Sequence, residues 1–111
     1  MEQIATVVNI HSLGIEDKDY VFIGRNGTDK SFGNPFRIPE QGNRKEVCRL
    51  YDQWLRGNMF VGFNQVQRQW ILDNLFILKN KRLGCFCSPK KCHGEVLIKL
   101  LEEIEEHGRI L

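Results

Sequence analysis

The chain has 111 residues, 41% of them hydrophobic, and its 16 Lys and Arg side chains against 14 Asp and Glu give a formal net charge of +2. A chain of this length fits one domain with one hydrophobic core, so we expect a single domain over residues 1–111. The balanced charge argues against a protein that binds a phosphate backbone through bulk electrostatics, and an extended nucleic-acid partner is not expected.

Neither a signal peptide nor a membrane span is expected. The segment from Met1 to Ile4 lacks the basic stretch and the long apolar segment that a signal peptide has. The longest apolar stretch, Met59 to Phe63, is far shorter than the ~20 residues that a membrane span needs. We therefore expect a cytoplasmic protein without a membrane partner, in which the four cysteines are reduced.

Two short apolar segments near the N-terminus are typical of β-strands. Residues 4–10 are rich in β-branched side chains, and residues 20–23 form a second apolar run. Only about nine residues separate the two runs, fewer than the dozen or more that a parallel crossover needs. The two strands should therefore either pair antiparallel or not be neighbours, and we expect a short mixed sheet.

The next segment, Gly24–Phe36, is predicted to be a long loop because it contains three glycines, one proline and no hydrophobic period. Loops of this length inside a small domain are usually functional or mobile. Arg25, Lys30 and the following Arg37 bring positive charge beside glycines that let a ligand approach the backbone. We interpret this loop as half of a binding site.

A first amphipathic helix is predicted after the loop. Asn43 followed three residues later by Glu46 resembles a capping box, and apolar residues then recur at helical spacing as far as Leu55. Cys48 lies at the edge of the apolar stripe, where a small buried filler is favoured over a reactive or ligating thiol. We leave Cys48 out of the candidate site.

A second helix is predicted from about Asn64 to about Leu75, with less regular periodicity. Its expected inward side chains are Val66, Trp70, Ile71 and Leu75. Because large aromatic side chains dominate small cores, we expect both Trp54 and Trp70 to be largely buried.

A dense group of cysteine and histidine residues marks the best candidate site. Residues 82–87 are predicted to form a short strand, and the last helix is predicted from Cys92 or His93 to Glu106. The stretch between them lies at the carboxyl end of a strand, where open α/β sheets bind ligands. The start of the helix, together with Lys90 and Lys91, gives a positive field that favours an anion and the thiolate form of Cys92.

Three interpretations of this stretch stay open. Three thiolates and one imidazole make a complete tetrahedral zinc set, which would consist of Cys85, Cys87, Cys92 and His93. The C-x-C and C-H spacing differs from the usual C-x₂-C pair, so a pocket without metal is an equal alternative. The third is a purely structural set of small buried thiols.

Two motifs together resemble a known family. They are Gly24-Arg25 with Gly33-Asn34-Pro35-Phe36, and the stretch 83–94 with the pattern L-G-C-F-C-x-P-x-x-C-H-G. The combination resembles a domain-of-unknown-function family of small uncharacterised proteins from bacteria and bacteriophages. That family commonly has proline after Gly-Arg and tryptophan between its first two cysteines, where this chain has Asn26 and Phe86. The resemblance covers about residues 20–101 and implies a bacterial or phage-infected host cell, but it supplies no reaction.

The predicted fold is a small three-layer, Rossmann-like α/β domain with a short mixed sheet and about three helices. The Gly24–Phe36 loop and the Cys87–Gly94 turn should form one pocket for a nucleotide-like or sugar-phosphate ligand. The candidate ligand-binding residues are Gly24, Arg25, Gly33, Asn34, Pro35, Cys87 and Gly94.

Each candidate residue has an expected role. Arg25, with Lys30 or Arg37, would contact phosphate, and Asn34 would offer its amide to a base or ribose. The backbone N–H groups of His93 and Gly94 would hold an oxyanion. Cys92 and His93 would be the catalytic pair if the protein is an enzyme. The alternatives are a phage protein that sequesters a nucleotide and a zinc-stabilised interaction domain. Zinc is the candidate cofactor.

Overall fold

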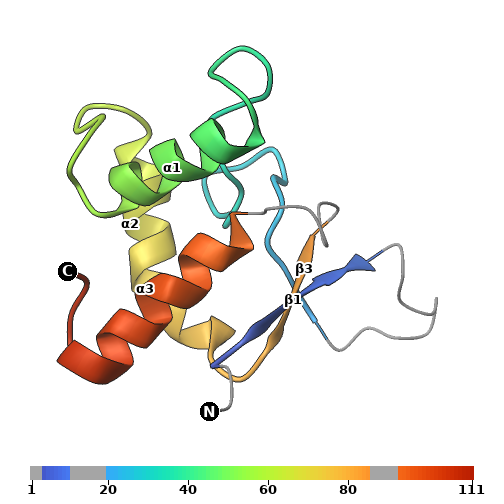
Figure 1. The fold of residues 1–111 in the computed structure, drawn as a ribbon, viewed down its shortest axis with the longest axis vertical. Helices are drawn as coiled ribbons and strands as arrows, with labels where there is room; N and C mark the ends of the chain where they lie inside the picture. Colours follow the sequence, from blue (N-terminus) through green and yellow to red (C-terminus); the bar gives the residue numbers. More distant parts are fainter. Residues whose placement is uncertain (1–3, 11–19, 86–92) are drawn as a thin grey trace.

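The computed structural model describes residues 4–10, 20–85 and 93–111, and Figure 1 shows its course. The described elements, in chain order, are β1 (Thr6–Asn9), β2 (Val21–Phe22), α1 (Arg44–Leu55), α2 (Gln65–Asn74), the short 3₁₀ helix η2 (Leu75–Leu78), β3 (Arg82–Cys85) and α3 (Gly94–His107). This part of the chain therefore belongs to the mixed α/β class, with three α-helices as predicted.

The described strands form one parallel sheet in the order β1-β3-β2. Thr6 is opposite Arg82 in the β1–β3 pair, and Val21 is opposite Leu83 in the β2–β3 pair. The predicted mixed sheet is wrong for these strands. The short link between β1 and β2 did exclude their being parallel neighbours, but β3 fills the central position and pairs with both.

The capping box at the start of α1 is confirmed. Asn43 Oδ1 accepts a hydrogen bond from the backbone N–H of Glu46 at 2.9 Å, and the Glu46 carboxylate accepts from the backbone N–H of Asn43 at 3.2 Å. The helix buries one apolar face, including Tyr51 and the fully buried Trp54. Cys48 is buried in this face, as its interpretation as a core filler predicted.

The inward face of α2 differs from the prediction. Ile71 and Leu75 are buried as expected, but Val66 is 71% exposed. Trp70 is partly buried and packs against the core, with its ring centroid 4.9 Å from that of Phe32. The buried position nearest the helix start belongs to the polar Gln67. The face of α2 is therefore set by what surrounds it and not by its own hydrophobic pattern.

The last helix, α3, lies between α1 and β1 and contacts both, as Figure 1 shows. Its buried side chains are Leu97, Leu100 and Leu101. The carboxylate of Glu103 on this helix accepts two hydrogen bonds of 2.7 Å from the guanidinium of Arg56. None of the helices in the described ranges is long and apolar enough to cross a membrane.

Candidate functional site

The Gly24–Phe36 loop contains no helix or strand, as predicted, yet its second half belongs to the core. Phe32 and Phe36 are buried. The hydroxyl of Tyr51 on α1 donates a hydrogen bond of 2.6 Å to the carbonyl of Phe32. Because buried carbonyl groups need a donor, this contact fixes the path of the loop across α1.

Gln67 holds the same part of the loop from α2. Its Nε2 donates to the carbonyl oxygens of Ser31 and Gly33, at 3.2 and 2.8 Å. The side chain is buried, so these bonds are shielded from water. Sequence analysis missed Gln67, because nothing in its local pattern separates it from the exposed glutamines of the same helix.

Asn34 was expected to offer its amide to a ligand, and the structure gives that amide two partners inside the protein. Its Nδ2 donates to the carbonyl of Val47 at 2.9 Å, and its Oδ1 accepts from the backbone N–H of Phe36 at 2.9 Å. Both ends of the side chain therefore hold the loop against α1. The nearby Pro35 is half-buried.

The backbone at Gly33 passes very close to the backbone at Arg25. A Cβ atom at Gly33 would lie 2.6 Å from the backbone nitrogen of Arg25, so only glycine fits there. The Arg25 guanidinium donates through Nη1 to the carbonyl of Asn34 at 2.9 Å. The two halves of the loop thus lie back to back, and Gly24 starts the loop two residues after β2 ends.

An open cleft of about 480 Å³ lies between the loop and the start of α2. It is mostly polar, and its lining includes Arg25, Thr28, Asp29, Ser31, Pro35, Arg37, Asn64 and Gln67. Of the three candidate phosphate contacts, Arg25 and Arg37 line the cleft and Lys30 does not. Asn64 makes no side-chain hydrogen bond to the first turn of α2, whose positive dipole end lies at this wall.

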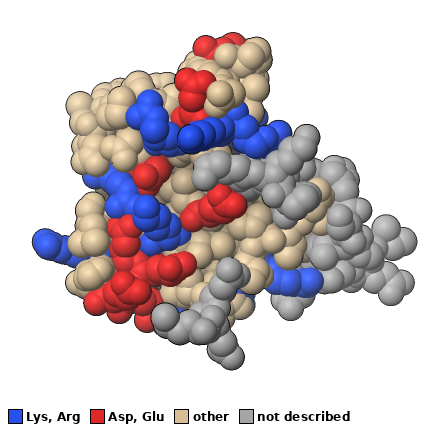
Figure 2. Space-filling view, in the orientation of Figure 1, with Lys and Arg blue, Asp and Glu red and all other residues tan. Residues whose placement is uncertain are grey.

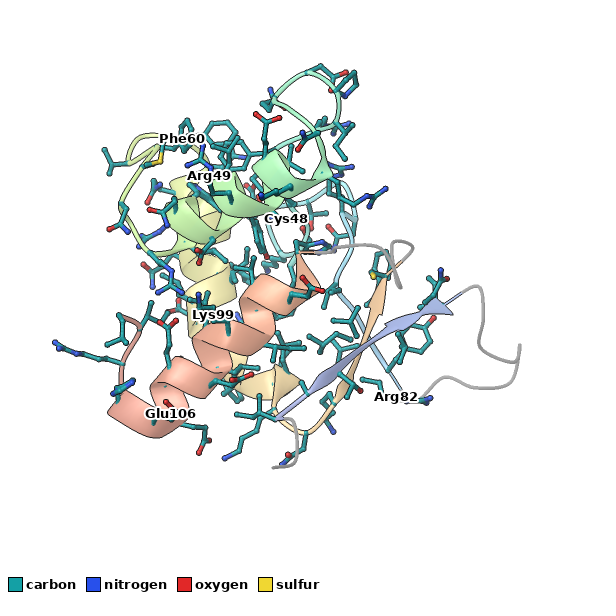
Figure 3. All side chains as sticks on the ribbon, in the orientation of Figure 1. Cys48, Arg49, Phe60, Arg82, Lys99 and Glu106 are labelled. Carbon is teal, nitrogen blue, oxygen red and sulfur yellow. The ribbon has the colours of Figure 1, made fainter. Side chains whose placement is uncertain are left out.

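A second cavity of about 500 Å³ lies between α1 and α3. Cys48 borders it, and Figure 3 shows Cys48, Arg49 and Lys99 on these two helices. Its charges are balanced: three basic side chains face three acidic ones, namely Lys45, Arg49 and Lys99 against Glu46, Asp52 and Glu95. Figure 2 shows both signs on this face of the molecule. The loop cleft is therefore the better site for an anion.

His93 is buried at the inner side of the loop. Its Nε2 lies 2.5 Å from the carbonyl oxygen of Ile23, which can only accept a hydrogen bond, so Nε2 carries the proton. Burial lowers the pKa of His93, the hydrogen bond to Ile23 opposes that shift, and the positive charge of Arg25 lowers the pKa further. The imidazole is therefore neutral at pH 7, and Nδ1 carries its lone pair.

His93, at the described end of the Cys87–Gly94 turn, is linked to the loop through Tyr51. The imidazole is perpendicular to the ring of Tyr51, with centroids 5.3 Å apart, and Tyr51 in turn binds the carbonyl of Phe32. Arg25 is close enough to act on the charge of His93. His93 nevertheless is not among the residues that line the polar cleft.

Gly94 starts α3 in direct contact with the sheet. A Cβ atom there would lie 2.8 Å from side-chain atoms of both Ile23 and Val7, so a side chain would push the helix away. Cys85, at the end of β3, is buried. Cys87 and Cys92, the other candidate ligands or catalytic residues, lie outside the described residues, and within the described ranges no three His, Cys, Asp or Glu side chains form a metal-binding group.

A family model with the description "Domain of unknown function (DUF4326)" matches residues 8–103. The chain belongs to the DUF4326 family. It is also similar to a protein of Acanthamoeba polyphaga mimivirus named "Uncharacterized protein R718", with 30% identity over 102 residues that cover 78% of this chain and 70% of the relative. No solved structure matches the chain.

The DUF4326 match includes both motifs on which the resemblance rested, residues 24–36 and 83–94. A domain-of-unknown-function family is thus found, as expected, and the relative is viral; the bacterial or phage origin and the two motifs stay predictions. Neither of these names assigns a reaction or a ligand.

Proposed function

We propose that this DUF4326 domain binds a small anionic ligand, a nucleotide-like or sugar-phosphate molecule, in the cleft between the Gly24–Phe36 loop and α2. The observation that carries the proposal is that Arg25 and Arg37 line the same cleft. Guanidinium groups bind phosphate oxygens through strong, often bidentate hydrogen bonds. Among the described residues Arg25 uses only its Nη1, on Asn34, which leaves its other N–H groups for a ligand.

The start of α2 adds to this positive field. Asn64 and Gln67 line the cleft, and the first turn of the helix has no side-chain cap. Backbone N–H groups at a helix start, together with the helix dipole, favour phosphate. The cleft therefore offers an anion three separate sources of attraction.

The size and the remaining polar groups favour a ligand larger than phosphate alone. About 480 Å³ lies within the ~300–1,000 Å³ range of small-molecule sites. The carboxylate of Asp29 also lines the cleft and can accept hydrogen bonds from sugar hydroxyl groups. A ligand with a sugar and a phosphate would use both the acidic and the basic side chains.

The proposal also assigns roles to the Cys87–Gly94 turn and to the pair Cys92 and His93. The Cys87–Gly94 turn would close the pocket in a Rossmann-like arrangement at the carboxyl ends of the parallel strands, where such sheets bind ligands. Cys92 with a neutral His93 would be the reactive pair of an enzyme. A protein that sequesters the ligand would return it unchanged, which product analysis after incubation distinguishes from turnover.

Isothermal titration calorimetry with pyrophosphate and ribose 5-phosphate tests the binding proposal. The best variant is Arg37→Gln, because the Arg37 side chain is exposed and makes no hydrogen bond with the described residues. We expect it to weaken binding by about tenfold or more, the effect of one charged hydrogen bond. Lys30→Gln is the matched control, since it removes one charge from the same loop outside the cleft. Equal effects of both variants, or no binding to the wild type, would contradict the proposal.

One observation favours zinc as a second candidate. Histidines that ligate metal usually donate their other ring N–H to a carbonyl or carboxylate, and His93 Nε2 makes such a bond with Ile23. Ile23 also donates its backbone N–H to the carbonyl of Gly84 at 3.0 Å, which brings Cys85 into the same neighbourhood. Cys87 and Cys92 would complete a Cys₃His set that stabilises an interaction domain.

Elemental analysis of protein purified without chelator tests the zinc candidate. A structural site predicts close to one zinc per chain and a marked loss of thermal stability when the metal is removed. A zinc content near zero would exclude this candidate without affecting the anion site.

A further inference from the structure

The segment between α1 and α2 exposes large apolar side chains beside the polar cleft. Phe60 is 38% exposed and Phe63 is 39% exposed. Both rings lie on the buried Phe36, with centroid distances of 4.9 Å for Phe60 and 5.4 Å for Phe63. Clustered exposed aromatic side chains on a small domain are typical of binding surfaces. The anion site proposed above does not use the surface formed by Phe60 and Phe63.

The protein holds these two residues in place. The indole N–H of the fully buried Trp54 donates to the carbonyl of Phe63 at 2.8 Å. The backbone N–H of Phe63 donates to the carbonyl of Phe60 at 3.0 Å, and Gln65 Nε2 donates to the same carbonyl at 3.1 Å. Because the backbone is fixed, a ligand that stacks on the rings loses little binding energy to ordering them.

Chain neighbours of the aromatic cluster of Phe36, Phe60 and Phe63 line the cleft. Pro35 and Arg37 line the cleft, and Phe36, which lies between them in the chain, packs against the rings of Phe60 and Phe63. Asn64, which follows Phe63 in the chain, lines the cleft as well. The exposed rings are therefore connected to the wall of the cleft through Phe36 and Asn64.

We propose that Phe60 and Phe63 form a stacking face for a nucleobase, so that the ligand of the cleft is a free nucleotide. This inference rests on the proposed anion site and names its substrate class. The phosphate would lie at Arg25 and Arg37, the sugar near Asp29, and the base on the aromatic pair. Stacking is worth roughly 5- to 150-fold in affinity per base and tolerates any base, because every base has a π face. We expect weak discrimination among bases.

Calorimetry with ribose 5-phosphate, AMP and CMP tests the stacking face. The wild type should bind AMP at least about five times more tightly than ribose 5-phosphate, which has the same phosphate and sugar but no base. In Phe60→Leu and Phe63→Leu this advantage should fall to about twofold or less, with ribose 5-phosphate binding unchanged. Leucine keeps an apolar contact with Phe36 and removes the π face. Phe76→Leu is the control, since Phe76 is 72% exposed on η2 and is not among the residues that line the cleft.

The outcomes separate this inference from the proposed function. If ribose 5-phosphate binds in an Arg37-dependent way and AMP binds no more tightly, the stacking face is wrong and the anion site stands. If neither ligand binds, both are wrong. A short oligothymidylate that binds more than about tenfold tighter than TMP would show a single strand as the ligand and overturn the assignment to a free nucleotide. The wild-type comparison needs no variant, so it holds even if a leucine variant fails to fold.

Discussion

The rings of Tyr51 and His93 are perpendicular and in contact, with centroids 5.3 Å apart and planes at 88°. The Tyr51 hydroxyl simultaneously donates to the carbonyl of Phe32 in the Gly24–Phe36 loop. One side chain of α1 therefore joins the loop to the start of α3, although about 60 residues of sequence separate these two segments. The relationship explains how a long loop without regular structure keeps a defined shape.

Removing that hydroxyl should destabilise the protein without disturbing the aromatic contact. Tyr51→Phe keeps the ring beside His93 but leaves the buried carbonyl of Phe32 without its donor. The expected loss in the free energy of unfolding is about 1–3 kcal/mol, measured by urea denaturation. Tyr20→Phe is the control, because the Tyr20 hydroxyl has no hydrogen-bond partner among the described residues. A loss as small as that of the control would show that the bond does not hold the loop.

Gln67 should matter for both stability and ligand binding. Gln67→Leu removes the donor that the carbonyl groups of Ser31 and Gly33 share, and we expect a loss of at least about 1–3 kcal/mol in the free energy of unfolding. The same variant should weaken pyrophosphate binding, since the loop that carries Arg25 loses its hold on α2. Gln69→Leu, an exposed change on the same helix, should alter neither quantity. Matching results for the two variants would refute the role assigned to Gln67.

Stability should depend on pH through Glu103. Its two hydrogen bonds from Arg56 lower the pKa of Glu103 from 4.5 to about 2. As the pH falls, the carboxylate of Glu103 is protonated at a higher pH in the unfolded chain than in the folded protein. The stabilisation is therefore complete above pH 4.5 and is lost as the pH falls toward 2. Glu103→Gln should reduce the steepness of the fall in unfolding free energy between pH 5 and pH 2. The exposed Glu106→Gln should keep the wild-type slope, and a slope unchanged in Glu103→Gln would contradict the pairing.

Much of the helical structure could be predicted from local sequence. The capping box at Asn43 and the apolar stripe of α1 depend on residues three or four positions apart, and so do the buried leucines of α3. These signals act within one element, and the structure confirms them. The buried state of Trp54 followed from the same stripe.

The rest depends on contacts between distant segments. β3 takes the central position between β1 and β2 from more than 60 residues away, so no local pattern indicates the parallel order. Gln67 points inward because the loop offers it two carbonyl oxygens, and Val66 is exposed for the same reason. The sequence did indicate Arg25 and Arg37 as candidate phosphate contacts, but it could not show that Lys30 lies outside the cleft.

The most direct test of the central claim is to map where an anion binds. Adding pyrophosphate to ¹⁵N-labelled protein should shift the amide NMR signals of Ser31, Arg37 and Gln67, and the signal of the Arg37 Nε–H. Signals from Leu100 and Lys79, which are not among the residues that line the cleft, should stay in place. Shifts confined to the surface of α1 and α3, or no saturable shifts at all, would contradict an anion site between the Gly24–Phe36 loop and α2.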